Sequence, residues 1–326
     1  MIRGIAALLL LIGSTGLALA QSDVAAAQWP DRPIRFVVPF PAGAATDVVA
    51  RIVAQRMGAI LGQTVVVENR VGASGTIGTE AVAKAAPDGY TIGFATATTH
   101  PIAASLSPHL GYDPIKDFTP VSMLGSTPYS LVAWKGLPVK TVADLVAYAK
   151  THPNTVAYSS VGPASLAHLA AQLFATTTGV EFVHVPYKSA SQAVFDLVEG
   201  RIQIQFGLVA ASLSMVREGK LNALAVTSAQ RVPDLPNVPT VAESGLPGYE
   251  ATLWTAVVMP ANVPAPIVSK LHKVIAGVLQ EPAIVEALQA KGFIVGSSTP
   301  EQLRGQIERD IKKWRDLAIK ANISVQ

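Results

Sequence analysis

The fold is decided by residues 34–47, which read IRFVVPFPAGAATD. The β-branched and aromatic run Ile34–Val38 is typical of a strand, and the prolines and small residues behind it predict a tight loop. Thr46 and Asp47 can then cap a helix in which apolar side chains recur at intervals of three and four residues. These apolar positions are Val49, Ile52, Val53, Met57 and Ile60. The stretch is therefore predicted to form a strand, a loop and a helix.

The same alternation continues along the chain. After the first unit we expect strands at 64–68 and 90–95, a helix at 77–85, and then a second alternating block. The strands expected in that block cover residues 130–134, 155–160, 181–185, 202–206 and 221–227, and the helices cover 141–150, 165–176, 192–199 and 212–218. Such alternation predicts an α/β fold in which mostly parallel sheets are covered by helices on both faces.

Two blocks of this kind predict two lobes. Residues 231–249, rich in proline and glycine, separate the second block from a mainly helical C-terminal part. The helices expected there cover 264–279, 282–291 and a last segment capped by Thr299. We expect residues 28–129 with 251–326 to form lobe 1, and residues 130–250 to form lobe 2. Ligands of such sheets bind beyond the carboxyl ends of the strands, so the loops that lead into helices are the places to look for a site.

The N-terminus has the features of an export signal. An apolar run at 5–12 follows a single arginine, and Ala18-Leu19-Ala20 matches the small-residue cleavage site of a secretory signal peptide. We expect residues 1–20 to be removed, with cleavage as late as residue 27 as an alternative. A transmembrane anchor is disfavoured because residues 13–16 interrupt the run and no second stretch of about 18 apolar residues follows. The protein is thus expected in the periplasm and is not expected to span a membrane.

Composition excludes several classes of function. Of the 326 residues, 14% are charged, the formal net charge is +3 and no run of lysine or arginine stands out, so a nucleic-acid binder is not expected. The chain lacks the phosphate loop, the H-E-x-x-H zinc motif and the G-x-S-x-G nucleophile elbow. It has no cysteine, and its six histidines are scattered without the spacing of metal ligands. We expect neither a metal site nor a cofactor.

Loops that follow expected strands carry the small and polar residues from which a binding site can be built. Small residues let backbone N–H groups approach a ligand, and the start of a helix favours an anion; ordinary strand-to-helix turns are the alternative. The candidates are Pro41, Ala42, Gly43, Ala44, Thr46, Asp47, Thr98 and His100 in lobe 1, and Ser160, Ser165, His168, Tyr187 and Lys188 in lobe 2. The aromatic side chains of Tyr129 and Trp254 could either line the same cleft or pack in a core.

These loops and several other short motifs together resemble a known family. The motifs are Pro39-Phe40-Pro41-Ala42-Gly43 with Asp47, Glu68-Asn69-Arg70 with Gly75, Pro87-Asp88-Gly89-Tyr90-Thr91, Tyr112-Asp113-Pro114, His184-Val185-Pro186-Tyr187-Lys188 and Val238-Pro239-Thr240-Val241-Ala242-Glu243. In this order they are similar to the substrate-binding proteins of tripartite tricarboxylate transporters, the Bug family. The resemblance implies the two-lobed fold of type II periplasmic binding proteins. It also implies a small carboxylate held between the lobes by backbone groups and ordered water of loops 41–47 and 160–168.

One departure from the family pattern bears on the ligand. Members commonly place an aspartate where this chain has Gly207, and an acidic side chain there could hold a ligand ammonium group. We therefore count Gly207 among the site residues and expect a ligand without a free amino group, such as a dicarboxylate, a hydroxy acid or an aromatic acid. The expected partners are this organic acid and membrane transporter subunits that take it up, with sensing of the acid as the alternative role. The receptor itself is expected to be a monomer without enzymatic activity.

Two other functions remain open from the residues alone. A secreted serine hydrolase could use Ser160 or Ser165 together with His168, with Asp196 or Glu199 as the orienting acid. Ser165 and His168 lie three residues apart on one helix face. A structural protein of the cell envelope is the third possibility, and it would bind no carboxylate.

Overall fold

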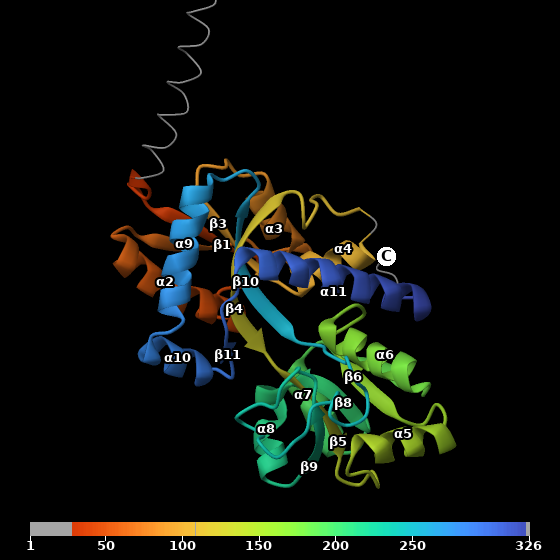
Figure 1. Cartoon of the computed structure of the whole chain (residues 1–326). Coiled ribbons are helices and arrows are strands. Elements are labelled where there is room, and N and C mark those ends of the chain that lie inside the picture. The colour runs from red at the N-terminus through yellow and green to blue at the C-terminus, as the bar shows by residue number, and fades with distance from the viewer. Residues whose placement is uncertain (1–27, 108, 324–326) are drawn as a thin grey trace, which may run out of the picture.

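Two β-sheets form the framework of the molecule, and each has helices packed against it (Figure 1). The structure is a computed structural model, and it describes residues 28–107 and 109–323. The expected signal peptide and its cleavage sites lie outside these residues. Within them, no helix is both long enough and apolar enough to cross a membrane.

The first sheet, on which lobe 1 is built, has six strands in the order β11-β4-β10-β3-β1-β2. They are β1 (Ile34–Val38), β2 (Val65–Asn69), β3 (Thr91–Thr96), β4 (Phe118–Thr127), β10 (Leu253–Pro260) and β11 (Ile294–Val295). β1 pairs in parallel with β2 and β3, whereas β10 runs antiparallel between β3 and β4. The helices of this lobe are α2 (Ala45–Leu61), α3 (Thr76–Ala83), α4 (Ala103–Leu106), α9 (Ala265–Val278), α10 (Pro282–Gln289) and α11 (Pro300–Lys320). α2 and α9 cover one face of the sheet, and α3 and α11 cover the other.

The second sheet, on which lobe 2 is built, has five strands in the order β7-β6-β8-β5-β9. They are β5 (Tyr129–Trp134), β6 (Ala157–Ser160), β7 (Val183–Pro186), β8 (Ile204–Leu208) and β9 (Leu221–Val226). β6 pairs in parallel with β7 and β8, and β5 runs antiparallel between β8 and β9. The helices are α5 (Val142–Thr151), α6 (Leu166–Thr178), α7 (Ala190–Val198) and α8 (Val209–Arg217). α5 and α6 pack on one face, and α7 and α8 on the other.

The chain passes between the two sheets twice. β4 ends at Thr127 and β5 begins at Tyr129, so the first crossing is the single residue Pro128. The return runs from β9 to β10 through residues 227–252. β4 and β10 pair along their whole length and lead from lobe 1 toward lobe 2 (Figure 1). The lobes are therefore joined by two neighbouring segments, which we call the junction.

In both sheets, the carboxyl ends of the parallel strands face the junction. β3 and β4 both run antiparallel to β10, so the carboxyl ends of β1, β2 and β3 lie where β4 leaves for lobe 2. In the second sheet β5 starts at the junction and pairs antiparallel with β8, with Tyr129 opposite Leu208. The carboxyl ends of β6, β7 and β8 therefore also face the junction. This edge is where ligands of α/β proteins bind.

The last helix, α11, ties the two lobes together. Leu303 and Ile307 in its first half pack into the core of lobe 1, whereas Trp314 and Leu317 pack into the core of lobe 2 beside α6. The helix begins as predicted, because Thr299 and Gln302 exchange the two hydrogen bonds of a capping box. Its length lets it cover both sheets.

Two features of this fold were not predicted correctly from the sequence. β4 and β10 were missed, because β10 is buried at seven of its eight positions and shows no alternation, while β4 contains Pro120 and Gly125. The prediction that Thr46 or Asp47 caps the first helix was wrong. The capping position is Ala44, which makes no side-chain cap, and Asp47 lies inside the first turn.

Candidate ligand-binding site

Asp47 holds the loop between β1 and α2 in shape. Its Oδ2 accepts hydrogen bonds from the N–H of Gly43 (2.8 Å) and from Nε of Arg51 (2.9 Å), and its Oδ1 accepts one from Nδ2 of Asn69 (2.8 Å). The same Asn69 nitrogen donates to the carbonyl oxygen of Phe40 (3.0 Å). Asp47 is only 2% exposed. We therefore regard it as a positioning residue for the loop rather than as a ligand contact.

These contacts also fix the charge of Asp47. Burial alone would raise the pKa of its carboxyl group, but hydrogen bonds from Arg51, Gly43 and Asn69, with the positive charge of Arg51, outweigh that effect and lower the pKa to about 2. The group is thus ionised at neutral pH. A negative charge in the first turn also stabilises the positive end of α2.

The start of α2 presents backbone donors without partners. Within the described part of the chain, the N–H groups of Ala45 and Thr46 have no hydrogen-bond acceptor, and no side chain caps the helix. Pro41, Ala42 and Gly43 in front of them are exposed, and Gly43 adopts a φ of +81°, which favours glycine. Free N–H groups at the start of a helix form a site for an anion. The start of α2 is therefore a candidate anion site at the junction edge of the first sheet.

In lobe 2 the loop between β6 and α6 is shaped by two serines that share one partner. Oγ of Ser160 lies 2.9 Å from the carbonyl oxygen of Gly162 and accepts from the N–H of the same residue (3.0 Å). Oγ of Ser165 donates to that carbonyl (2.7 Å) and caps α6 by accepting from the N–H of His168 (3.4 Å). Both hydroxyl groups are engaged inside the turn. The loop therefore offers a ligand mainly its backbone.

Two histidines and a tyrosine support this loop by stacking. The ring centroids of His168 and His184 lie 4.4 Å apart, and those of His184 and Tyr158 lie 5.0 Å apart. Nδ1 of His168 accepts from the N–H of Ala164 (3.1 Å), and Nε2 of His184 lies 2.6 Å from Oγ of Ser160. Burial, with a smaller effect of His184, lowers the pKa of His168 to about 4, and burial also lowers the pKa of His184. His168, a predicted contact, is thus a largely buried support.

His100 lies inside lobe 1. It is fully buried between the rings of Tyr112 and Phe118, with centroid distances of 6.3 and 4.8 Å, and its Nδ1 lies 3.1 Å from Oγ1 of Thr99. Burial lowers the pKa of His100 to about 3. Its neighbour Thr98 is half-buried and opens the short π-helix Thr98–Ile102. In this conformation His100 packs in the core, so we leave it out of the proposed ligand contacts.

The two aromatic candidates separate. Trp254 is 2% exposed in the core of lobe 1, and its Nε1 donates to Oδ2 of Asp310 (2.8 Å). Tyr129 is half-buried at the first position of β5, directly after the crossing at Pro128. Burial raises the pKa of its hydroxyl group to about 12, so it is protonated at neutral pH. Of these two aromatic residues, only Tyr129 therefore remains a candidate at the junction.

The remaining candidates of lobe 2 lie at the carboxyl ends of β7 and β8. Tyr187 is half-buried, and its hydroxyl group donates to Oδ2 of Asp196 (2.9 Å). Lys188 is exposed beside it, and Gly207 is half-buried near the end of β8. The structure thus brings the loop residues of lobe 2 to one edge, as the strand pattern requires.

Sequence reasoning missed three side chains that shape these loops. Asn69 clamps the first loop, His184 holds Ser160, and Gln205 lies against Gly207. Asn69 stood in the quoted motif Glu68-Asn69-Arg70, but no local signal told which atoms it would reach. Gln205 interrupts an otherwise apolar strand, and that polar residue was the available signal.

The arrangement does not favour a hydrolase. No hydrogen bond joins the side chains of Ser165 and His168, since Ser165 bonds to Gly162 and Nδ1 of His168 is occupied by a backbone N–H. Ser160 does lie within hydrogen-bond distance of His184, but it is only 4% exposed. In the described residues, no cluster of histidine, aspartate and glutamate is suited to hold a metal ion.

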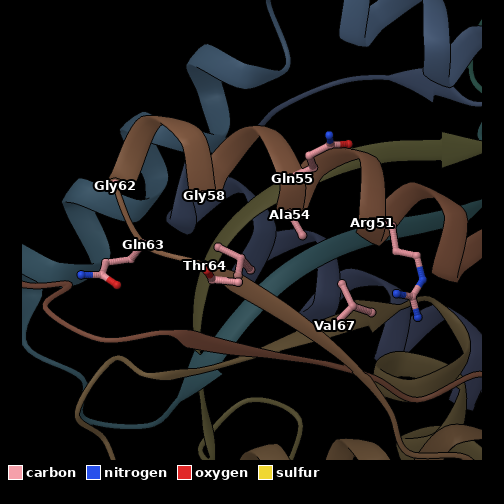
Figure 2. Close-up of a pocket in the computed structure, with 9 residues that line it drawn as sticks. Arg51, Ala54, Gln55, Gly58, Gly62, Gln63, Thr64 and Val67 are labelled. Atoms are coloured by element: carbon pink, nitrogen blue, oxygen red, sulfur yellow. The ribbon is translucent and has the colours of Figure 1, made fainter.

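A surface groove of 640 Å³ lies elsewhere on lobe 1, between α2 and β2. Its lining includes Gly58 and the side chains of Arg51, Ala54, Thr64 and Val67, which lie between the helix and the strand in Figure 2. Gly62 and Thr64 mark the amino end of β2, opposite to the edge that faces the junction. The groove thus extends away from the candidate site, although Arg51, which bonds to Asp47, also lines it.

Two α/β lobes, a two-segment junction and helix starts that face it define the class of two-lobed solute-binding proteins. Solved structures agree with this class. The R. palustris protein Rpa4515, solved with adipate, is 38% identical with a TM-score of 0.75, over 91% of this chain and 99% of that chain. MatC from Rhodopseudomonas palustris, solved with bound malate, is 34% identical with a TM-score of 0.71, over 89% of this chain and 99% of that chain.

The chain belongs to the tripartite tricarboxylate transporter family of receptors, whose model matches residues 49–323. It is also similar to the protein BugT of Bordetella pertussis, with 40% identity over 316 residues that cover 96% of each chain. The family and the fold class predicted from the sequence are both confirmed.

Proposed function

We propose that this protein is a periplasmic receptor that captures a small carboxylate between its lobes and delivers it to membrane transporter subunits. The observation that carries the proposal is the convergence of both carboxyl-end edges on one junction. The loops at these edges present helix starts, backbone donors and few charged side chains. Such a surface suits an anion that is bound by hydrogen bonds.

Neither loop 41–47 nor loop 160–168 contains an arginine or lysine that could pair with the carboxylate. Hydrogen bonds can nevertheless give useful affinity. A hydrogen bond to a charged group contributes about 1.5–3 kcal/mol, and a micromolar complex needs about 8 kcal/mol of net binding free energy. Several bonds from both loops reach this range, and closure of the lobes would add apolar contact. Binding alone is sufficient for the proposed role, and we propose no catalytic step.

We further propose that the ligand lacks a free amino group. Gly207 supplies no negative charge at the end of β8, so an ammonium group would lose its hydration there without gaining an ionic partner. Two relatives of known structure hold adipate and malate, which are acids without an amino group. These observations support a dicarboxylate, a hydroxy acid or an aromatic acid as the ligand.

A substitution at Ala45 tests the role of the helix start. Ala45 is the first residue of α2, and Ala44 before it has φ −65° and ψ 157°, a conformation that is compatible with a following proline. Ala45→Pro should therefore fold normally but lose one backbone donor, whereas Ala45→Ser keeps the N–H. Titration calorimetry with adipate, malate and aspartate measures the binding.

We expect at least one of the two amine-free acids to bind to the wild type and to Ala45→Ser, and to bind about tenfold more weakly to Ala45→Pro. The thermal midpoint of the variants without ligand should stay close to that of the wild type. Equal affinity of Ala45→Pro and Ala45→Ser would remove the helix start from the site. Tight binding of aspartate, with both other acids silent, would contradict the proposed ligand class.

A further inference from the structure

The side chain of Gln205 occupies the space that a side chain at position 207 would need. Gln205 and Gly207 point to the same face of β8, since they are two residues apart. A Cβ atom added to Gly207 would lie 3.1 Å from both Cδ and Oε1 of Gln205. The amide therefore leans along the strand toward its carboxyl end, which faces the junction. The space beside Gly207 is therefore bordered by the neutral amide of Gln205.

Two polar atoms at this place have no partner. Nε2 of Gln205 donates to Oγ of Ser159 on β6 (3.0 Å), but Oε1 of Gln205 has no hydrogen-bond partner in the described residues. Oγ of Ser130, on the strand position directly opposite Gly207, is likewise unpartnered among them. Gln205 is 6% exposed and Ser130 is fully buried. Buried polar atoms without partners destabilise a fold, so a ligand group that paired with these two atoms at the proposed binding edge would remove that penalty.

The chemistry of these two groups selects what can bind. A hydroxyl group both donates and accepts, so it can donate to Oε1 of Gln205 and accept from the Ser130 hydroxyl. The ligand hydroxyl group would also fit if the Gln205 amide were rotated by half a turn, because it could then accept a hydrogen bond from Nε2. A carboxylate can only accept, so it would leave Oε1 of Gln205 unpaired. An ammonium group could donate to Oε1 and to the Ser130 oxygen, but Gly207 supplies no negative charge to offset its loss of hydration. A ligand hydroxyl is therefore the best complement to this pair.

We propose that Gln205 and Ser130 form a specificity subsite, which binds a hydroxyl group next to a carboxylate and makes the protein a receptor for hydroxy acids. This inference rests on the proposed function, because it assumes a carboxylate bound at the junction. Gly207 contributes by leaving room, and a side chain there would displace the amide. The loops bind the carboxylate, and the neutral hydrogen bonds of the subsite select acids that also carry a hydroxyl group.

Three four-carbon acids that differ in one substituent test the subsite. Succinate has no substituent on its second carbon, malate has a hydroxyl group and aspartate has an ammonium group. Titration calorimetry of the full-length mature protein should give malate an affinity about tenfold higher than that of succinate, the factor that two added neutral hydrogen bonds can supply. Adipate serves as a separate probe for binding of an acid without a hydroxyl group.

Gln205→Met and Ser130→Ala are the test variants, and Gln203→Met is the matched control. Both polar atoms of Gln203 are paired, because Oε1 accepts from the N–H of Ala157 (2.9 Å) and Nε2 donates to the carbonyl of Gly200 (3.1 Å). The two test variants should reduce the preference for malate over succinate to less than threefold. Ser130→Ala should not lower the thermal midpoint without ligand, since it removes an unpaired atom. Gln203→Met should lower that midpoint and keep the preference.

The results separate the inference from the function on which it rests. If succinate or adipate binds at least as tightly as malate, the hydroxyl subsite is refuted while the carboxylate receptor stands. A tenfold preference that survives Gln205→Met and Ser130→Ala would also refute it. If none of the four acids binds, both the subsite and the proposed function are overturned. Loss of the preference in both test variants, but not in Gln203→Met, supports the subsite.

Discussion

The imidazole rings of His168 and His184 lie face to face, with their centroids 4.4 Å apart and their planes 19° from parallel. Tyr158 continues the stack beyond His184. Nδ1 of His168 accepts a hydrogen bond from the N–H of Ala164, so a proton on that nitrogen would replace the acceptor by a second donor. The folded state therefore requires His168 to be neutral, and this requirement couples the loop at residues 160–165 to pH.

We expect the protein to lose stability as the pH falls from about 6.5 to 4. In the unfolded chain His168 takes up a proton near its ordinary pKa of 6.5, whereas in the folded chain its pKa is lowered to about 4. The unfolded state thus binds more protons in this window, and the free energy of unfolding falls by about 3 kcal/mol from this residue. Urea denaturation at pH 7.5, 5.5 and 4.5 measures the change.

His168→Asn separates this residue from the other titrating groups. Oδ1 of asparagine can take the place of Nδ1 as the acceptor for Ala164, and it does not titrate. The variant should show a smaller loss of stability between pH 7.5 and 4.5 than the wild type. An identical pH dependence of the two proteins would contradict the prediction.

The second prediction concerns Asp47. Asp47→Asn keeps the size of the side chain but removes the charge that accepts from Arg51 and Gly43, so we expect a loss of about 2 kcal/mol in the free energy of unfolding. The first loop should lose order, and the affinity for adipate or malate should fall about tenfold. Asp316→Asn is the control, because Asp316 is 59% exposed in its ion pair with Lys312, and such pairs contribute little. Equal effects of the two variants would argue against the positioning role.

The sequence predicted what local patterns determine. Residues 34–61 carry both the β-branched run of β1 and the apolar spacing of α2, and the structure has both elements there. The role of Asp47 was only partly open to prediction. Gly43 and Arg51 lie four residues away from it on either side, but Asn69 reaches it only when β1 and β2 pair. Long-range pairing decides this contact, and no local pattern records it.

The same limit applies to the candidate site. The loops at the carboxyl ends of strands were found because glycine, serine and threonine gather there. The burial of His100 was not foreseen, and for Trp254 the sequence left the cleft and the core open. Only packing against Phe118 and the bond to Asp310 distinguish the two environments. Gln205 stood out in the sequence as a polar residue in an apolar strand, but its contact with the space at Gly207 is known only from the structure.

The third prediction compares two glycines in helices. A Cβ atom at Gly78 in α3 would lie 2.5 Å from the carbonyl oxygen of Arg70 and 3.0 Å from Cα of Pro39, and both are backbone atoms. Gly78→Ala should therefore push α3 away from the first loop, cost about 1–3 kcal/mol and weaken ligand binding. A Cβ atom at Gly277 in α9 meets nothing within 4 Å, so Gly277→Ala should stabilise the helix by about 0.5–1 kcal/mol.

Urea denaturation and calorimetry with adipate or malate measure both glycine variants. The test is that the two substitutions change the free energy of unfolding in opposite directions, because intrinsic helix propensity alone would make both of them stabilising. A stabilised Gly78→Ala with unchanged affinity would show that α3 does not support the loop.

The fourth prediction compares two tryptophans that are almost equally buried. Trp254 on β10 is 2% exposed and donates to Asp310, whereas Trp314 on α11 is 1% exposed and its Nε1 has no partner in the described residues. Trp254→Phe removes apolar contact and leaves Asp310 without one donor, although Lys313 (2.7 Å) remains bound to it. Trp314→Phe removes apolar contact and weakens the contact with the ammonium group of Lys313, which lies 4.4 Å from the centre of the Trp314 ring. We expect Trp254→Phe to cost about 1–2 kcal/mol more, because hydrogen bonds to charged groups are the stronger kind. Thermal and urea denaturation of both variants measure the difference, and an equal or larger loss for Trp314→Phe would contradict a stabilising role of the bond from β10 to α11.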